Sequence, residues 1–170
     1  MIVEALVRRK TQDMVRDAAA TLLRETFEAD LGGIGRIDRA DLWAFDVDAA
    51  DGTALVKDVL EDTTLVVNPN IHRYSLAPWS DVPESGTRLF VRVQDRVDSK
   101  GSQVLRAIRD RLGRPEVKEA QRSVLWTIDL KTADADAAEA AGRAMVGEAR
   151  GAGILANPHA QDAEIRVVSA

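Results

Sequence analysis

The chain has 170 residues, of which 45% are hydrophobic and 30% charged, with a formal net charge of −5 and no cysteine. This length gives room for one compact domain or two small ones. An acidic chain lacks the basic face that general nucleic-acid binding needs, and no apolar run approaches the roughly 20 residues of a membrane span. Without cysteine there is no disulfide, thiolate metal site or cysteine nucleophile. We expect a reduced, cytoplasmic protein without a signal peptide.

The first half of the chain predicts strands that alternate with amphipathic helices. Short β-branched stretches are typical of strands, and apolar residues spaced three and four apart are typical of one helix face. A polar turn at residues 39–41 separates two of the strands. The expected strands are residues 2–8, 34–38, 42–47 and 71–76, and the expected helices are residues 12–30, ended by Gly32 and Gly33, and 53–67, ended by Asn68-Pro69.

The second half repeats this order after a linker at residues 77–87. Pro78, Pro83 and Gly86 interrupt any periodic pattern in the linker. Because Trp79 is large and apolar, we expect it to dock on one of the two units. The expected strands of the second half are residues 88–93, 117–122, 124–130 and 163–168, and the expected helices are residues 102–112 and 135–150.

Two landmarks occur twice in the chain. Leu42-Trp43 recurs 83 residues later as Leu125-Trp126, and Asn68-Pro69 recurs 89 residues later as Asn157-Pro158. We place the six additional residues of the second copy near Gly147, Gly151 and Gly153. A repeat this long is a whole folding unit, since solenoid repeats span roughly 20 to 50 residues. The sequence therefore predicts an α+β protein of two ferredoxin-like βαββαβ units, residues 1–76 and 88–170, packed as a pseudo-dimer. Trp43 and Trp126 are expected to lie in the core or to pack the units together.

The order of these landmarks resembles the PurS family, the small subunit of phosphoribosylformylglycinamidine (FGAM) synthase. The second unit has the turn Val97-Asp98-Ser99-Lys100-Gly101 and the segment Leu155-Ala156-Asn157-Pro158. The first unit has Val66-Val67-Asn68-Pro69 and Tyr74, but its turn at residues 10–13 lacks the glycine. A charged hairpin of the family survives in part at residues 38–41 and 121–124.

The resemblance implies a function without chemistry in this chain. PurS proteins hold a PurQ-type glutaminase against a PurL-type, ATP-dependent synthetase in purine biosynthesis. ATP, magnesium and glutamine would serve the whole complex, and no cofactor is expected here. Whether two tandem chains form a homodimer stays open. The candidate partner-interface residues are Asn68, Pro69, His72, Arg73, Arg122, Asn157, Pro158 and His159.

Several of these residues also have a purely structural interpretation. For the two Asn-Pro pairs we favour a helix stop in which the asparagine side chain bonds nearby backbone. Two histidines without clustered carboxylates are a poor metal signal, so we expect surface histidines. Two interpretations of an arginine cluster stay open, a complement to a helix dipole or an acidic partner surface; its members are Arg106, Arg109, Arg111 and Arg114.

Two other functional classes compete with the scaffold. Tandem ferredoxin-like repeats are also typical of small-molecule-sensing regulatory modules. A small α+β-barrel enzyme would need a wet cavity lined by polar groups, which the apolar Trp43 and Trp126 disfavour. No nucleophile–base pair or nucleotide-binding loop stands out in the sequence. The scaffold therefore remains our leading hypothesis.

Overall fold

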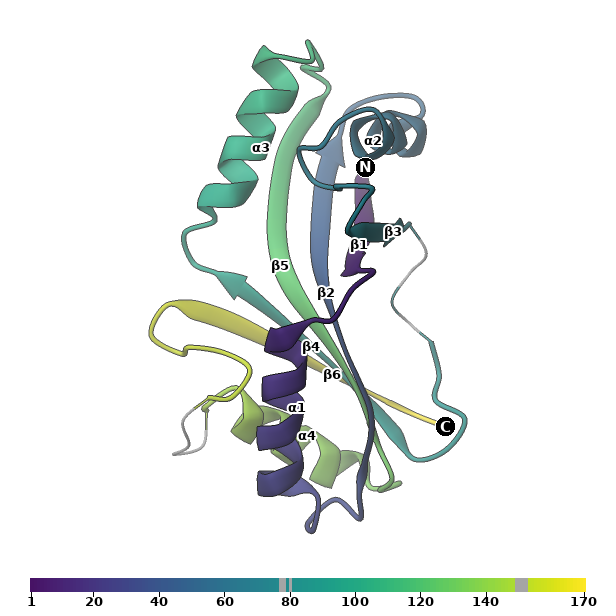
Figure 1. Ribbon diagram of the computed structural model, residues 1–170, viewed down its shortest axis with the longest axis vertical. Coiled ribbons are helices and arrows are strands. Elements are labelled where there is room, and N and C mark those ends of the chain that lie inside the picture. Colours follow the sequence, from purple (N-terminus) through teal and green to yellow (C-terminus); the bar gives the residue numbers. More distant parts are fainter. Residues whose placement is uncertain (77–78, 80, 149–152) are drawn as a thin grey trace. The chain divides into compact units, whose positions relative to one another are not determined.

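A computed structural model describes residues 1–76, 79, 81–148 and 153–170. Within them the strands are β1 (Ile2–Arg9), β2 (Ile34–Val47), β3 (His72–Ser75), β4 (Thr87–Asp95), β5 (Val117–Leu130) and β6 (Gln161–Ser169). The helices are α1 (Met14–Phe27), α2 (Gly52–Glu61), α3 (Ser99–Asp110) and α4 (Ala135–Met145). The fold is α+β, with one antiparallel sheet in the order β3-β1-β2-β5-β4-β6 (Figure 1). None of these helices is both long and apolar enough to cross a bilayer.

An aspartate directly precedes each of these four helices and caps it. The aspartate side chain accepts hydrogen bonds from backbone N–H groups of the first turn, which have no partner within the helix. Helix α1 ends at Phe27, earlier than the predicted residue 30, and the chain then turns through Gly32 and Gly33, whose φ angles of 66° and 129° suit glycine. The capping residues are Asp13, Asp51, Asp98 and Asp134.

The chain divides into two compact units, and each takes segments from both halves of the sequence. Unit 1 consists of Met1–Gln12, Ala40–Pro78 and Val97–Ser123. Unit 2 consists of Asp13–Arg39, Trp79–Arg96 and Val124–Ala170. The predicted division at residues 76 and 88 describes a repeat in the sequence, and as a domain boundary it stays a prediction.

The core of unit 1 packs two helices from different halves against the sheet. Strand β1 pairs with β2 on one side and β3 on the other. Trp43 and Phe45 stack with ring centroids 6.1 Å apart, and Val104 and Ile108 of α3 join the same cluster. Trp43 is therefore a core residue of unit 1. Its predicted role in packing the units together stays a prediction.

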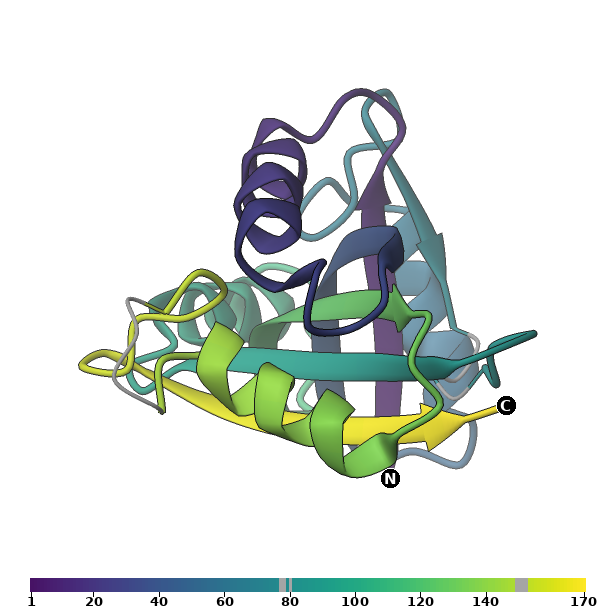
Figure 2. The same cartoon turned by 90° about the horizontal axis from the view of Figure 1, so that it is seen from below.

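The core of unit 2 is built in the corresponding way. Helix α1 contributes Ala19, Ala20 and Leu23, and they cluster with residues of β4, β5 and α4. Trp126 lies in this cluster and is 3% exposed. Figure 2 shows α4 alongside β4 and β6, which pair over their whole length.

The linker tryptophan also docks on unit 2. The Trp79 ring lies edge-on to Phe90 with centroids 5.5 Å apart, and the Arg166 guanidinium lies 5.7 Å from the Trp79 ring centre. The prediction that Trp79 docks on one unit is confirmed. The linker residues 77, 78 and 80 lie outside the described residues.

The two predicted strand pairs were wrong, because each is one continuous strand. Residues 34–38 and 42–47 belong to β2, and residues 117–122 and 124–130 belong to β5, each strand having 14 residues. Figure 1 draws both as unbroken arrows. The partial hairpins expected at residues 38–41 and 121–124 are thus extended backbone, and each half has the order βαβαβ.

The polar strand midpoints remain extended because their side chains find partners in that conformation. Arg39 lies 3.2 Å from Asp13, and Arg122 lies 2.8 Å from Asp41. Ser123 is buried and its hydroxyl donates to the Leu42 carbonyl at 3.4 Å. The two tetrapeptides contain aspartate or serine, which suit turns, but these side chains and the arginines find their partners in the extended conformation.

The helix predicted at residues 53–67 also ends earlier than expected, at Glu61. The Thr63 hydroxyl donates to the Val59 carbonyl at 2.7 Å and accepts from the Leu65 N–H at 3.3 Å, which closes the helix end. Helix α4 ends at Met145. The rest of its predicted range reaches residues 149–150, which, like Gly151, lie outside the described residues.

Neither half of the chain is expected to fold by itself. A fragment of residues 1–78 lacks α3 and the start of β5, and a fragment of residues 79–170 lacks α1 and the start of β2, so each unit would lose core residues. We expect each fragment to show no cooperative monomeric unfolding in urea, whereas an equimolar mixture recovers it. The control is the full chain cleaved at the same junction, and a cooperative monomeric transition of either fragment alone would contradict the prediction.

Candidate functional site

The first Asn-Pro pair forms a tight turn between α2 and β3. The Asn68 side-chain Oδ1 accepts from the Asn70 N–H at 3.0 Å, and its carbonyl accepts from the N–H groups of Ile71 and His72. The Asn68 N–H donates to Nδ1 of His72 at 3.2 Å. His72 is thereby held in the turn, with Nδ1 as the acceptor.

The second Asn-Pro pair repeats this turn bond by bond. Oδ1 of Asn157 accepts from the His159 N–H at 3.1 Å, and its carbonyl accepts from the N–H groups of Ala160 and Gln161. The Asn157 N–H donates to Oε1 of Gln161 at 2.8 Å, so Gln161 takes the place of His72. The expected bonding of the asparagine side chains to nearby backbone is confirmed in both turns. Contact of these residues with a partner stays a prediction.

In each half of the chain, the basic residue directly after the first strand, β1 or β4, bonds to the turn. In unit 1, Nζ of Lys10 donates to the Pro69 carbonyl at 2.6 Å. In unit 2, Arg96 donates to the carbonyls of Pro158 and His159, both at 3.2 Å. The repeated unit therefore includes a cationic side chain that donates hydrogen bonds to backbone carbonyls of the turn.

Several basic residues lie around the first turn. In the antiparallel pairing of β1 with β3, Arg8 lies opposite Arg73 and Arg9 lies opposite His72. The strand register therefore brings basic residues that are distant in sequence to the same end of the β1–β3 pair. We call Arg8, Arg9, Lys10, His72 and Arg73 the basic corner. The sequence predicted His72 and Arg73, but it missed the other three residues, whose signal is a run of three cations at a strand end.

Around the second turn the charge is balanced. Arg96 pairs with Asp162 at 2.9 Å, and Nε2 of Gln161 donates to Asp95 at 2.7 Å. Arg92 lies 4.0 Å from Glu164. The two turns therefore share a backbone geometry and differ in the charge that they present.

Tyr74 follows the basic corner on β3 and is tied to α2. Its hydroxyl donates to Glu61 at 2.5 Å. Burial, together with this hydrogen bond to Glu61, raises the pKa of Tyr74 to about 12. Tyr74 therefore stays a neutral donor at physiological pH, and it fixes the strand that carries Arg73.

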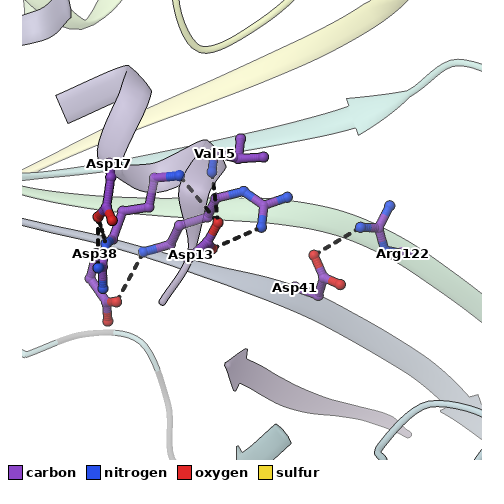
Figure 3. A network of polar contacts seen from close by, with 8 residues as sticks. Asp13, Val15, Asp17, Asp38, Asp41 and Arg122 are labelled. Carbon is purple, nitrogen blue, oxygen red and sulfur yellow. Dashed lines mark hydrogen bonds and ion pairs between the residues drawn. The ribbon is translucent and has the colours of Figure 1, made fainter. Parts of the chain in front are cut away.

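Figure 3 shows the polar contacts at the start of α1 and, separately, those of Arg122. Asp13 accepts from the N–H groups of Val15 and Arg16 and pairs with Arg39. Arg122 pairs through its side chain with Asp41, and its N–H donates to Asp98 at 2.6 Å. Arg122, a predicted interface residue, thus has a structural role in unit 1.

The arginine cluster of α3 serves mainly to hold the end of that helix. Arg109 donates to the carbonyls of Val117 and Lys118, both at 2.9 Å. Arg114 lies 3.9 Å from Asp58. Arg106 and Arg111 line an open groove beside Leu65. Arg109 thus ties the end of α3 to β5, and both interpretations of the cluster, a complement to the helix dipole and an acidic partner surface, stay predictions.

The chemistry available at the basic corner is the binding of an anionic group. Arg9, Lys10 and Arg73 are exposed, and they present cations that suit carboxylates or phosphates. Within the described ranges, no three His, Asp or Glu side chains lie together in a way that could hold a metal ion. Compared with known proteins, the sequence matches no family model and no curated relative.

His72 is expected to stabilise its turn through Nδ1 alone. His72→Ala leaves the Asn68 N–H without its acceptor and should lower the free energy of unfolding by about 1 kcal/mol. His72→Gln should lower it by less than about 0.5 kcal/mol, because Gln161 supplies the same acceptor to the second turn. Urea unfolding of both variants is the measurement. Equal loss in the two would show that another property of the histidine matters.

Gly101 of α3 is expected to resist substitution. A Cβ at this position would lie 2.3 Å from the carbonyl oxygen of Ala120 and 2.2 Å from the Asp98 carboxylate. Gly101→Ala should therefore destabilise by about 2 kcal/mol, although alanine is the better helix former. Lys100→Ala, an exposed change in the same turn, is the control for thermal unfolding and should stay within about 0.5 kcal/mol of the parent. A stabilised Gly101→Ala protein would contradict the close approach.

Proposed function

We propose that the chain is a tandem PurS-like scaffold, a non-catalytic subunit of FGAM synthase that joins a PurQ-type glutaminase to a PurL-type synthetase. The observation that carries the proposal is the repeated Asn-Pro turn, which has corresponding hydrogen bonds in both copies, a group of basic residues around the first copy and paired charges around the second. A duplicated module with two different surfaces suits a protein that contacts two different partners. A scaffold also needs no catalytic constellation of its own.

The composition of the units supports a ferredoxin-like module that exchanges segments. Unit 1 contains β1, β3, parts of β2 and β5, and the helices α2 and α3. Unit 2 contains β4, β6, the other parts of β2 and β5, and the helices α1 and α4. Four strand segments and two helices are what a split βαβ module contains. We infer that the two repeats are such modules, each completed by one helix and one strand segment of the other repeat.

Corresponding grooves in the two units have also diverged in chemistry. The groove of unit 2 is open, has a volume of about 540 Å³, and lies along Met14, Ala18 and Leu22 of α1. The groove of unit 1, about 520 Å³, lies along α3 and is lined by Gln103, Arg106, Asp110 and Arg111. An apolar groove and a charged groove select different protein surfaces, which supports two distinct partners.

The apolar groove also favours the competing sensing function. Trp126 lines it together with Arg39, whose guanidinium lies 5.8 Å from the Trp126 ring centre. Such a combination of aromatic, aliphatic and cationic groups is typical of small-ligand sites. A ligand that binds the native state raises the melting temperature. A shift with an amino acid or nucleotide, without any effect on synthase activity, would favour the sensor.

Reconstitution tests the scaffold directly. The PurQ-type and PurL-type proteins of the same genome are assayed for glutamine-dependent FGAM formation, with and without this chain. We expect glutamine-dependent activity to rise at least tenfold with the chain, and ammonia-dependent activity to change little, because a scaffold delivers ammonia without altering the synthetase chemistry. Unchanged glutamine-dependent activity at saturating chain would reject the proposal.

Arg73→Glu is expected to separate partner binding from stability. The change places a carboxylate at an exposed position opposite Arg8 in the pairing of β1 with β3, so the melting temperature should change little. Contact with an acidic partner surface should weaken, and the chain concentration for half-maximal synthase activity should rise about tenfold. Lys100→Glu is the matched control, an equally large charge change at another exposed residue of unit 1. Equal effects of both variants would show that only net charge matters.

A further inference from the structure

Strand β6 ends the sheet order in unit 2, and it is a long edge. It spans nine residues, Gln161–Ser169, whereas β3, the other terminal strand of the order, spans four. Among the described residues its one hydrogen-bonded strand neighbour is β4. An edge strand of this length presents a row of backbone N–H and C=O groups to any strand that can pair with it.

The sequence of β6 is complementary to itself. Ile165 is the midpoint of the nine residues. In an antiparallel pair of two copies centred on Ile165, Glu164 of each copy lies opposite Arg166 of the other, and Ala163 lies opposite Val167. Opposite charges at directly opposed positions stabilise a strand pair. Both ion pairs form at once, because a two-fold interface contains every contact twice.

The two faces of β6 fit this pairing as well. Ala163, Ile165 and Val167 pack against the core of unit 2 on the face covered by α4. In the pair they would meet their counterparts and continue that core across the new strand boundary. Glu164 and Arg166 lie on the opposite face, because side chains alternate along a strand. The apolar and the charged contacts therefore stay on separate faces.

The charged side chains are available and held in place. The Glu164 side chain is 64% exposed, with Arg92 at 4.0 Å. Arg166 is exposed, and its guanidinium lies 5.7 Å and 6.0 Å from the ring centres of Trp79 and Phe90. This stacking fixes the cation on the charged face while its N–H groups remain able to donate.

We propose that two copies of this chain associate through β6, antiparallel about Ile165, and extend the sheet of unit 2 into the second copy. The other terminal strand, β3, has four residues and no such pair of opposite charges, so it lacks the self-complementarity of β6. Edge charges that protect against association are usually of one sign, whereas β6 has opposite signs on either side of its midpoint. The proposal does not depend on the function proposed above.

A charge-swap experiment on the full chain tests the pairing. The parent should sediment as a concentration-dependent dimer across a roughly hundredfold range of concentration. Glu164→Arg alone places two arginines opposite each other twice, and Arg166→Glu alone does the same with glutamates, so each should weaken dimerisation roughly tenfold or more. An equimolar mixture of the two variants restores both ion pairs and should form a heterodimer. The double variant Glu164→Arg/Arg166→Glu should dimerise again.

Two results would overturn the proposal. The first is a parent chain that remains monomeric over the whole range. The second is a dimer that both single variants form as well as the parent does, which would place the interface elsewhere. Circular dichroism checks that each variant is folded. Hydrogen exchange of the unmodified chain provides a test without variants: the β6 amides should exchange more slowly in the concentrated sample, and equal exchange at both concentrations would also reject the pairing.

Discussion

The structure depends on two long strands that stay extended through polar midpoints. In each, a charged residue at the middle could belong either to a turn or to a strand. Arg39 and Arg122 find carboxylates in the extended conformation, and in each pair both side chains are at most 30% exposed. Leaving one member of such a partly buried pair without its partner is costly. The ion pairs therefore favour the continuous strand over the hairpin.

This continuity determines how the chain is divided. Because β2 and β5 do not fold back on themselves, the boundary between the units falls inside both strands. Helix α1, which precedes β2, therefore packs in a core made mostly of second-half residues. Helix α3, which precedes β5, packs in a core made mostly of first-half residues. Each repeat therefore contributes core residues to the unit that consists mainly of the other repeat. A mutation in α1, such as one at Leu23, acts on a core made mostly of second-half residues.

The sequence predicted local features well and nonlocal ones poorly. The positive φ angles of Gly32 and Gly33 and the bonding of Asn68 and Asn157 to nearby backbone follow from the chemistry of single residues, and the structure has them, whereas helix ends differ from the predicted ones by several residues. The turn at residues 39–41 was wrong because its outcome depends on Asp13, which is distant in sequence. The basic corner was found only in part for the same reason. Arg8 and Arg73 are separated by most of the first half, and only the strand register brings them opposite each other.

Duplication within one chain gives a freedom that two identical subunits lack. In a symmetric dimer every surface occurs twice, so a change that suits one partner is imposed on both copies. Here the two turns retain one backbone geometry while Gln161 and Asp162 replace His72 and Arg73. The terminal strands have diverged further, one short and cationic, the other long and of mixed sign. Three hydrogen bonds of each turn use only the asparagine and backbone groups, and the side-chain acceptor can be either histidine or glutamine, so the neighbouring side chains can change while the turn is kept. The part of the turn that is kept is thus separate from the part that varies, and this separation allows one repeated turn to present two different surfaces.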